Sequence, residues 1–230
     1  MYIAPAKFAK KKVKRKVSKK KKVKRKVSRK ENKKNLEVRS IRYKRHPDYS
    51  LGASQIGAAI GVSTWCSRQE QWRLITGRKK FEGNERTRWG IIHEEMALRE
   101  YQAVTGFSVG NTLKDQKVMR KAYLRATPDG FTATHILEIK CPYNQKIPQQ
   151  PTPQYMAQVQ LQMYLTNGKY NKAHLFYWTP KNFRVFEIGF DRNYVNEMLE
   201  LADEFWSYVL DDIEPPRKRK PTLHIYKHQW

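Results

Sequence analysis

The chain has 230 residues, of which 39% are hydrophobic, and its 47 lysines and arginines against 21 acidic residues give a formal net charge of +26. A charge of this size favours a polyanion as partner, and nucleic acid is expected rather than an anionic membrane. The sequence has no run of 18 apolar residues and no apolar stretch after its basic start, so we expect neither a membrane span nor a signal peptide.

Residues 1–35 are predicted to form a disordered, Lys/Arg-rich tail. Residues 7–34 contain 18 lysines and arginines and one glutamate, and a ten-residue unit, KKVKRKVSKK, is repeated with one change. Like charges at this density repel one another and oppose folding. We interpret the tail either as a DNA-binding arm or as a nuclear-import signal. As an arm it would contact phosphates through bases that include Lys14, Arg15, Lys24 and Arg25.

Residues 36–214 are predicted to form one folded domain, followed by a basic C-terminal extension over 215–230. The patterns predict helices at 54–61, 67–77, 85–105, 153–167 and 191–212, and strands at 36–43, 107–112, 117–126, 135–141, 172–178 and 183–190. Glycines at the ends of three of these helices are typical stop signals. The order of the elements predicts an α/β fold with a mixed β-sheet core flanked by helices.

Two acids and a lysine lie between apolar segments in the stretch ATPDGFTATHILEIKCPY, residues 126–143. Side chains alternate between the two faces of a strand. In a strand over 135–141, Glu138 and Lys140 therefore point the same way, and Ile139 points into the core. A surface strand that carries a Glu–Lys ion pair is the alternative interpretation of this pattern.

Asp129 lies on the turn that precedes this strand. If the strand pairs with the one predicted at 117–126, Asp129 comes beside Glu138. Two carboxylates at one place repel each other unless a cation lies between them. Oxygen ligands without Cys or His nearby favour Mg²⁺, with Mn²⁺ as a substitute, and the main-chain carbonyl of Ile139 is a further candidate ligand. Lys140 could then hold or deprotonate a water that attacks a phosphate.

Two predicted helices carry further polar candidates. The helix before the strands holds Glu94 and Glu95, and helical geometry does not choose between them, because both lie equally close to the apolar ridge. In the helix that follows the acidic strand, Tyr155, Gln158 and Gln162 share one stripe. Gln158 could donate to a phosphate or to a metal-bound water, or it could belong to a solvated polar face.

Four blocks of the sequence together resemble one known family. They are WGxxxE ending at Glu94, TPDG around Asp129, LEIKCP around Glu138 and Lys140, and YMAQVQ around Gln158. In this order the blocks resemble the lambda-type exonucleases, or YqaJ-like viral recombinases, of the PD-(D/E)xK nuclease superfamily. The resemblance covers roughly residues 50–210.

The resemblance implies a restriction-endonuclease-like fold and a Mg²⁺-dependent deoxyribonuclease. The implied activity is 5′→3′ exonuclease digestion of double-stranded DNA, which leaves 3′ single strands for recombination or repair. Family members form ring-shaped trimers around DNA and work with a single-strand-annealing protein, so a homo-trimer and such a partner are expected. An intracellular location is expected because no signal peptide or disulfide framework is predicted, and the nucleus or viral DNA is the expected place.

The resemblance also implies which residues bind the metal. Asp129, Glu138 and the carbonyl of Ile139 would be ligands, and Glu94 rather than Glu95 would be the carboxylate from the helix.

Other roles are implied for residues that act on the substrate. Lys140 would lie beside the attacking water, Gln158 would be an accessory polar group, and Ser54 in the segment GASQIG would contact a substrate phosphate. One position departs from the family pattern. The arginine that holds the terminal 5′-phosphate in the type member lies seven residues before this serine, where the chain has Pro47. Arg45 is the nearest candidate replacement.

Several alternatives stay open or are disfavoured. An endonuclease or junction resolvase of the same superfamily and a non-catalytic DNA-binding module both remain possible. A nucleotide-driven motor is disfavoured, because no GxxxxGK[ST] motif is present. The histidines, among them His135 and His174, show no metal-ligand spacing and are expected to be ordinary core or surface residues. Cys66 and Cys141 are too few for a disulfide framework and are expected to be reduced.

Overall fold

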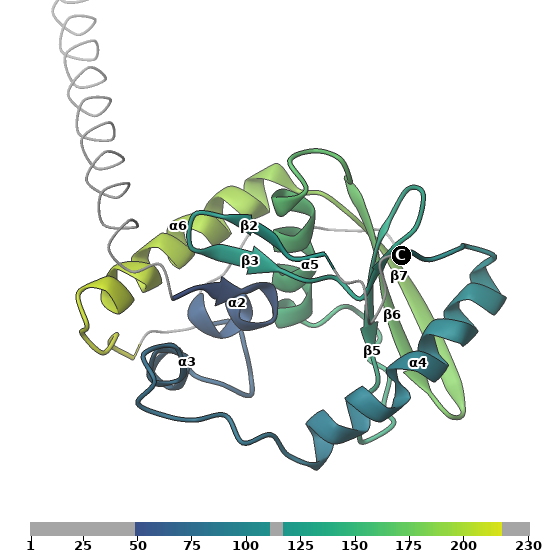
Figure 1. Cartoon of the computed structure of the whole chain (residues 1–230), viewed down its shortest axis with the longest axis horizontal. Helices are drawn as coiled ribbons and strands as arrows, with labels where there is room; N and C mark the ends of the chain where they lie inside the picture. Colours follow the sequence, from purple (N-terminus) through teal and green to yellow (C-terminus); the bar gives the residue numbers. More distant parts are fainter. Residues whose placement is uncertain (1–48, 111–116, 218–230) are drawn as a thin grey trace, which may run out of the picture. The chain divides into compact units, whose positions relative to one another are not determined.

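The computed structural model describes residues 49–110 and 117–217. The predicted tail, the strand expected at 36–43 and most of the C-terminal extension lie outside the described residues, as do Lys14, Arg15, Lys24, Arg25 and Arg45. The elements are β1 (Leu51–Gly52), α2 (Ala53–Ala59), α3 (Arg68–Ile75), α4 (Glu85–Thr105), β2 (Met119–Lys121), β3 (Leu124–Ala126), β4 (Gly130–Phe131), β5 (Ile136–Lys140), α5 (Pro153–Leu165), β6 (Lys172–Thr179), β7 (Asn182–Gly189) and α6 (Arg192–Leu210) (Figure 1).

The strands form two mixed sheets. The smaller sheet has the order β1-β3-β2, and the larger sheet has the order β4-β5-β6-β7. In the larger sheet β5 and β6 are parallel, whereas β4 and β7 pair antiparallel at its two edges. Parallel neighbours need a crossover connection, and α5 is that crossover. Mixed sheets flanked by helices confirm the predicted fold class.

The pairing predicted between 117–126 and the acidic strand is wrong. Residues 119–126 form a hairpin of β2 and β3 in the smaller sheet, whereas β5 pairs with β4 and β6. The hairpin turns at Ala122, which has a φ of 52°. Glycine or asparagine normally occupies such a position, so the sequence carries no turn signal there. In the described part of 107–112 there is no strand, only one bridge between Gly110 and Phe131.

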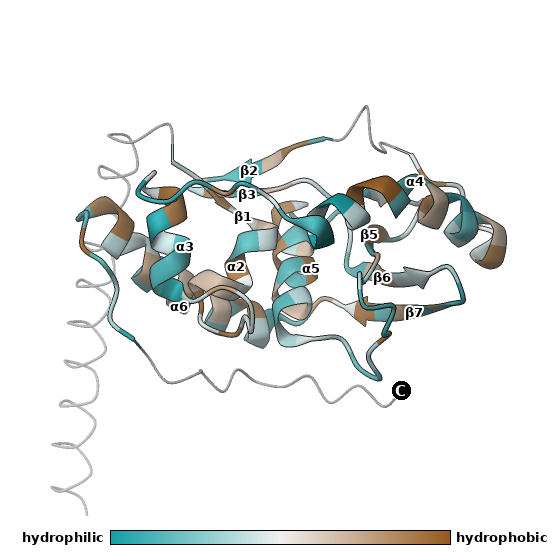
Figure 2. Ribbon diagram, turned by 90° about the horizontal axis from the view of Figure 1, so that it is seen from below, coloured by the Kyte–Doolittle hydropathy of each residue, from teal (hydrophilic) through white to brown (hydrophobic). Residues whose placement is uncertain are grey.

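Helices cover both faces of the larger sheet. On one face, Val159 and Met163 of α5 pack with Ile136 and other buried strand residues. On the other face, Leu98 of α4 packs with Leu137 and with further strand residues. Figures 1 and 2 show α5 between the larger sheet and α2, whereas α4 lies against the larger sheet away from α5. The even-numbered residues of β5, which include Glu138 and Lys140, therefore face α5.

The helix α5 is fixed in place by a close approach to α2. A Cβ atom added at Gly57 would lie 2.7 Å from the Cβ atom of Gln154, a distance that real side chains do not tolerate. Glycine at this position therefore allows the two helices to touch. This contact holds the helix that supplies Gln158 and Gln162 to the face of β5.

The long helix α4 is apolar on more than one side. Ala97, Leu98 and Tyr101 are buried, whereas Ile92 and Met96 are exposed, and Figure 2 shows hydrophobic residues recurring along it. None of the helices in the described ranges is both long and apolar enough to cross a membrane.

Candidate metal centre

Asp129 is brought to β5 by the short strand that follows it. Gly130 pairs with Leu137, and the main-chain N–H of Asp129 donates to the carbonyl oxygen of Leu137 over 3.1 Å. The main-chain N–H of Ile139 donates to Oδ2 of Asp129 over 2.6 Å. The carboxylate therefore lies at the point of β5 where Glu138 and Lys140 flank Ile139. Asp129 and Glu138 are neighbours as predicted, but β4 rather than the strand at 117–126 makes them so.

Glu138 is a buried carboxylate with three polar partners. Only 2% of its surface is exposed, and its Oε1 accepts hydrogen bonds from Lys140 and from Gln158. Its Oε2 accepts a bond from the side-chain amide of Gln162. A buried carboxylate is stable only when it is paired and hydrogen-bonded, and these three groups meet that need from α5 and from β5 itself.

The amine of Lys140 lies between a carboxylate and an aromatic ring. Nζ donates to Glu138 and lies 4.7 Å from the ring centroid of Tyr155. Burial lowers the pKa of Lys140, but the negative charge of Glu138 and smaller contributions from other neighbours outweigh it, so the pKa rises. The ammonium group is therefore held as a cation next to the acidic centre.

The structure distinguishes Glu94 from Glu95. Glu94 is half-buried and lines the same cavity as Asp129 and Lys140. Glu95 is exposed and forms an ion pair with Arg99 one helical turn further on. The helix carboxylate that faces the candidate site is thus Glu94.

The three carboxylates influence one another electrostatically. Burial raises the pKa of Asp129 well above its usual value, and the charge of Glu138 raises it further. Burial also raises the pKa of Glu94, again with a contribution from Glu138, while Lys140 opposes both shifts. Like charges held together in a buried site are costly, and a divalent cation would relieve that cost. Carboxylate oxygens suit a hard ion such as Mg²⁺.

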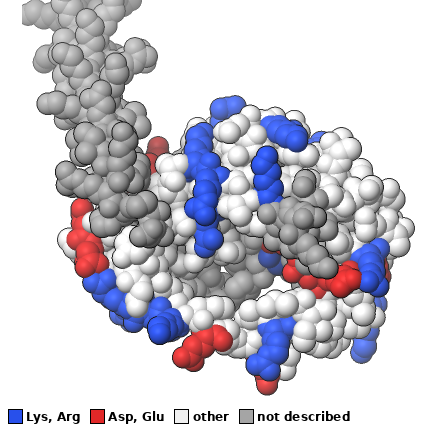
Figure 3. All heavy atoms as spheres, in the orientation of Figure 1, with Lys and Arg blue, Asp and Glu red and all other residues white. Residues whose placement is uncertain are grey.

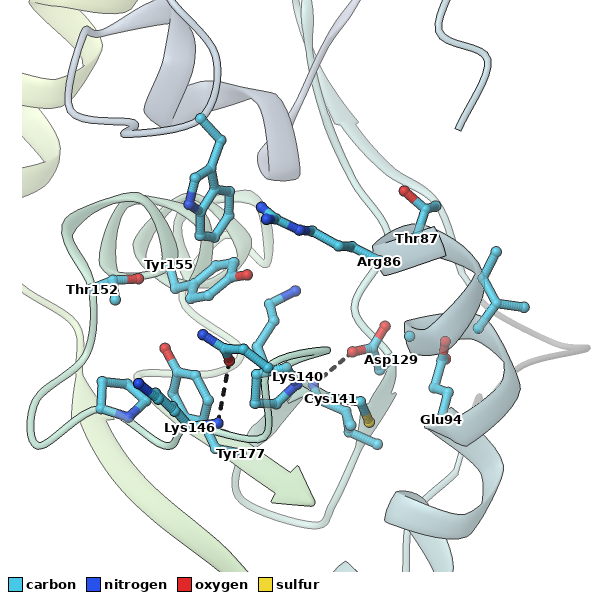
Figure 4. A pocket seen from close by; sticks show the side chains of 17 residues that line it. Arg86, Thr87, Glu94, Asp129, Lys140, Cys141, Lys146, Thr152, Tyr155 and Tyr177 are labelled. Carbon is cyan, nitrogen blue, oxygen red and sulfur yellow. Dashed lines mark hydrogen bonds between the residues drawn. The ribbon is translucent and has the colours of Figure 1, made fainter. Parts of the chain in front are cut away.

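Glu94 and Asp129 open onto a cavity of about 470 Å³, whereas Glu138 is not among the residues that line it. One part of its lining is acidic and contains Glu94 and Asp129, with Lys140 beside them (Figure 4). Aromatic and basic side chains make up much of the rest, namely Trp65, Tyr155, Tyr177, Arg86 and Lys146. In Figure 4, Arg86 extends from the start of α4 toward Tyr155. The cavity therefore combines an acidic centre with groups that suit a nucleotide and its phosphate.

The structure shows the surroundings of two further predicted site residues. Ser54 is exposed in the first turn of α2 and is not among the residues that line the cavity. Gln158 is buried, so it does not belong to a solvated polar face, and its side-chain amide donates to Glu138. Its observed partner makes it a support for a carboxylate.

The sequence prediction missed three features of this region. Gln162 was placed on the stripe of Gln158 but given no role, although it is fully buried and bonded to Glu138. Trp65 and Arg86 come from a loop and a helix start, and no sequence pattern linked them to β5. Their approach to the site depends on tertiary structure alone.

His135 and His174 are buried, as expected of core histidines, but the sheet also brings their side chains together. Together with Glu187 they form a group whose ligand atoms all lie within 4.8 Å of one another, and it is the one such group of three in the described part of the chain. Strand pairing produces it, because His174 lies opposite both Leu137 and Glu187 in the sheet. Sequence spacing could not reveal this contact.

Basic side chains gather on one surface of the folded part. Arg120, Lys121 and Arg125 of the smaller sheet are exposed, and Figure 3 shows rows of Lys and Arg side chains over the region of β2 and β3. Such rows suit a polyanion.

The fold and the acidic centre define an α/β protein in which carboxylates gather around β5 of a mixed sheet. The sequence matches the family model described as the YqaJ-like viral recombinase domain over residues 36–169. This match covers more than half of the chain, so the chain belongs to the family of YqaJ-like viral recombinase domains, and the predicted resemblance is confirmed. No curated protein matches the chain at a significant level of similarity.

Two exonucleases of known structure have a similar fold. An alkaline exonuclease from Laribacter hongkongensis is 21% identical, with a TM-score of 0.60 over 72% of this chain and 90% of that chain. The same protein in complex with dAMP gives the same values. A phage-related exonuclease from Haemophilus somnus 129PT is 16% identical, with a TM-score of 0.53 over 70% of this chain and 92% of that chain. At these identities the similarity is one of fold.

Proposed function

We propose that the chain is a Mg²⁺-dependent deoxyribonuclease that digests double-stranded DNA from its ends in the 5′→3′ direction. The products would be 3′ single strands for recombination or repair. The observation that carries this proposal is the meeting of Glu94, Asp129, Glu138 and Lys140 beside one cavity, in a chain of a viral recombinase family. The shared fold with alkaline and phage-related exonucleases supports it.

The donor groups fit a hard divalent cation. Oδ1 of Asp129 takes no part in the bond to Ile139, and Oε2 of Glu138 accepts a single bond from Gln162. With the carbonyl of Ile139 and with Glu94, these atoms would supply an oxygen-only set, which suits Mg²⁺ or Mn²⁺. When bound, the ion would stabilise the charge that develops on the phosphate and would activate a water.

The protein's own side chains would position the reactants. Lys140, fixed between Glu138 and the ring of Tyr155, would hold the attacking water and donate to the phosphate. Gln158 and Gln162 would keep the Glu138 carboxylate in one orientation, because each donates to a different oxygen of it. Catalysis of phosphodiester hydrolysis depends mainly on such positioning and on charge stabilisation.

The cavity and the basic surface would bind the DNA. Trp65 and Tyr155 offer aromatic faces on which a base can stack, and their rings lie 5.3 Å apart. Lysines and arginines on the smaller sheet and in the tail would contact phosphates further along the duplex. An annealing partner, a homo-trimer and an intracellular location in the nucleus or at viral DNA belong to the same proposal.

Among the residues that the structure describes, Arg86 is our candidate for holding the terminal 5′-phosphate in place of the family arginine. It lines the cavity, and its guanidinium can form two parallel bonds to a phosphate. We expect Arg86→Ala to lower kcat/KM on 5′-phosphorylated duplex about tenfold or more, because a hydrogen bond to a charged group is worth roughly 1.5–3 kcal/mol. On 5′-hydroxyl duplex the same variant should change little.

Arg88 supplies the matched control, because it is exposed on the same helix and does not line the cavity. Arg88→Ala should behave like the wild type on both substrates. Arg86 would be excluded from end recognition if both variants lost kcat/KM equally. It would also be excluded if Arg86→Ala lowered kcat/KM equally on 5′-phosphorylated and 5′-hydroxyl duplex. Arg45 would then be the next candidate.

The function itself is tested with linear and covalently closed duplex DNA in Mg²⁺, each linear strand labelled at one end. We expect digestion of the linear duplex only, with early release of the 5′ label and late loss of the 3′ label. Comparable nicking of closed circles would favour an endonuclease or junction resolvase. Tight binding without cleavage of either substrate would favour a non-catalytic DNA-binding module.

A further inference from the structure

Three side chains that the nuclease proposal does not use converge on a second site. His135 directly precedes β5, His174 lies in β6 and Glu187 lies in β7. Nε2 of His135 is 3.1 Å from Oε2 of Glu187, and Nε2 of His174 is 3.7 Å from the same oxygen. Both imidazoles are thus directed at one carboxylate oxygen.

The other nitrogen of each imidazole already has a partner. Nδ1 of His135 is 2.8 Å from the hydroxyl of Thr134, and Nδ1 of His174 is 2.6 Å from the hydroxyl of Tyr101. A hydroxyl oxygen can accept the Nδ1–H bond, which leaves the lone pair of Nε2 for a metal. Metal-binding histidines commonly have such an outer partner, which fixes the orientation of the ring.

The two carboxylate oxygens of Glu187 also have different partners. Its Oε1 accepts a bond from Lys172 over 2.9 Å, whereas its Oε2 faces the two imidazoles. The lysine therefore orients the carboxylate without occupying the oxygen that would be the ligand. About half of the Glu187 side chain is exposed, so a water can complete the coordination from the solvent side.

We propose that His135 Nε2, His174 Nε2 and Glu187 Oε2 form a binding site for a divalent transition-metal ion, with zinc as the preferred ion. Two imidazoles and one carboxylate form a ligand set used by zinc, and they disfavour Mg²⁺, which takes oxygen ligands. The rings now stack with centroids 4.0 Å apart and 23° between their planes, so they would turn for both lone pairs to reach one ion. The ion would link β5, β6 and β7.

This site is separate from the candidate nuclease centre. His174 contacts Tyr101 of α4, so it lies on the α4 face of the sheet. Glu138 is bonded to residues of α5 on the opposite face. The proposal therefore does not depend on the nuclease function, and either can fail without the other.

The test uses the full chain without a histidine tag, freed of metal by a chelator and titrated with ZnCl₂ in a calorimeter. We expect one equivalent to bind with high affinity, and Glu187→Gln to weaken that binding at least about tenfold. Zinc should also raise the melting temperature of the wild type by mass action, and it should raise that of the variant less at the same zinc concentration. Because about half of the Glu187 side chain is exposed, Glu187→Gln should fold normally, which its melting temperature without zinc will show.

Three controls make the result specific. Glu200→Gln, at an exposed carboxylate of α6, should bind zinc as the wild type does. Glu138→Gln should retain the site, which separates it from the nuclease centre. Replacing His46, His224 and His228 together with glutamine should leave the high-affinity equivalent in place. An unchanged affinity in both Glu187→Gln and His174→Gln, or no zinc binding by the wild type, would overturn the proposal and leave a histidine–carboxylate ion pair.

Discussion

Glu138→Gln should reduce cleavage of linear duplex DNA to below about 1% of the wild-type rate, a loss typical of a group that stabilises transition-state charge. The change keeps the size of the side chain but removes the charge that would hold a cation between it and Asp129. It also replaces one of two accepting oxygens with an NH₂ donor, so the bonds at Oε1 and the bond from Gln162 at Oε2 cannot all be kept. Asp129→Asn should have a similar effect. The measurement is the initial rate of nucleotide release in Mg²⁺.

DNA binding provides the control for this loss. Affinity for duplex comes mainly from bases on phosphates, and neither substitution removes a base. Binding of both variants should therefore stay within a few-fold of the wild type at the same salt concentration. Melting temperatures will exclude loss of folding. Turnover above about 1% in both variants would remove these carboxylates from the catalytic role.

Glu94→Gln should lower the cleavage rate about a hundredfold, whereas Glu95→Gln should change it less than about twofold. Glu94 lines the cavity and lies close enough to Glu138 for that charge to raise its pKa. It would therefore contribute to cation binding, and removing one donor from such a centre costs roughly two orders of magnitude in rate. Glu95 is exposed and paired with Arg99, and surface ion pairs of this kind contribute little.

The adjacent position of the two glutamates makes each variant the control for the other. Both are glutamates of α4 and both are replaced with glutamine, so nonspecific effects of the substitution on folding or net charge should be equal. Raising the Mg²⁺ concentration should partly restore Glu94→Gln, because its defect is in cation binding. If Glu95→Gln lowered the cleavage rate more than Glu94→Gln does, Glu94 would not be the glutamate of α4 that belongs to the metal centre.

The acidic strand could be predicted because its signals are local. Alternation along a strand placed Glu138 and Lys140 on one face, and helical spacing placed Gln158 and Gln162 on one stripe; the structure shows both arrangements, joined by hydrogen bonds. The choice of Glu94 over Glu95 came from the family resemblance. Periodicity alone could not make it, because both lie near the apolar ridge.

The features that could not be predicted depend on the tertiary path of the chain. Asp129 reaches β5 through β4, which has two residues and no readable pattern. The β2–β3 hairpin that precedes β4 turns at Ala122, whose positive φ could not be predicted from an alanine. His174 and Glu187 meet through the register of β6 with β7, which side-chain chemistry does not specify. Each of these features depends on how segments of the chain are placed in the fold and not on the residue pattern within one segment.

The central claim is that Asp129, Glu138 and the carbonyl of Ile139 bind the catalytic metal. Its most direct test is anomalous diffraction from crystals of the full chain grown with MnCl₂ and a 5′-phosphorylated duplex, using data at the manganese edge. We predict a manganese peak between these three groups, with Glu94 nearby, and no such peak in Glu138→Gln. Manganese bound elsewhere in the folded domain, with none at this position, would contradict the account.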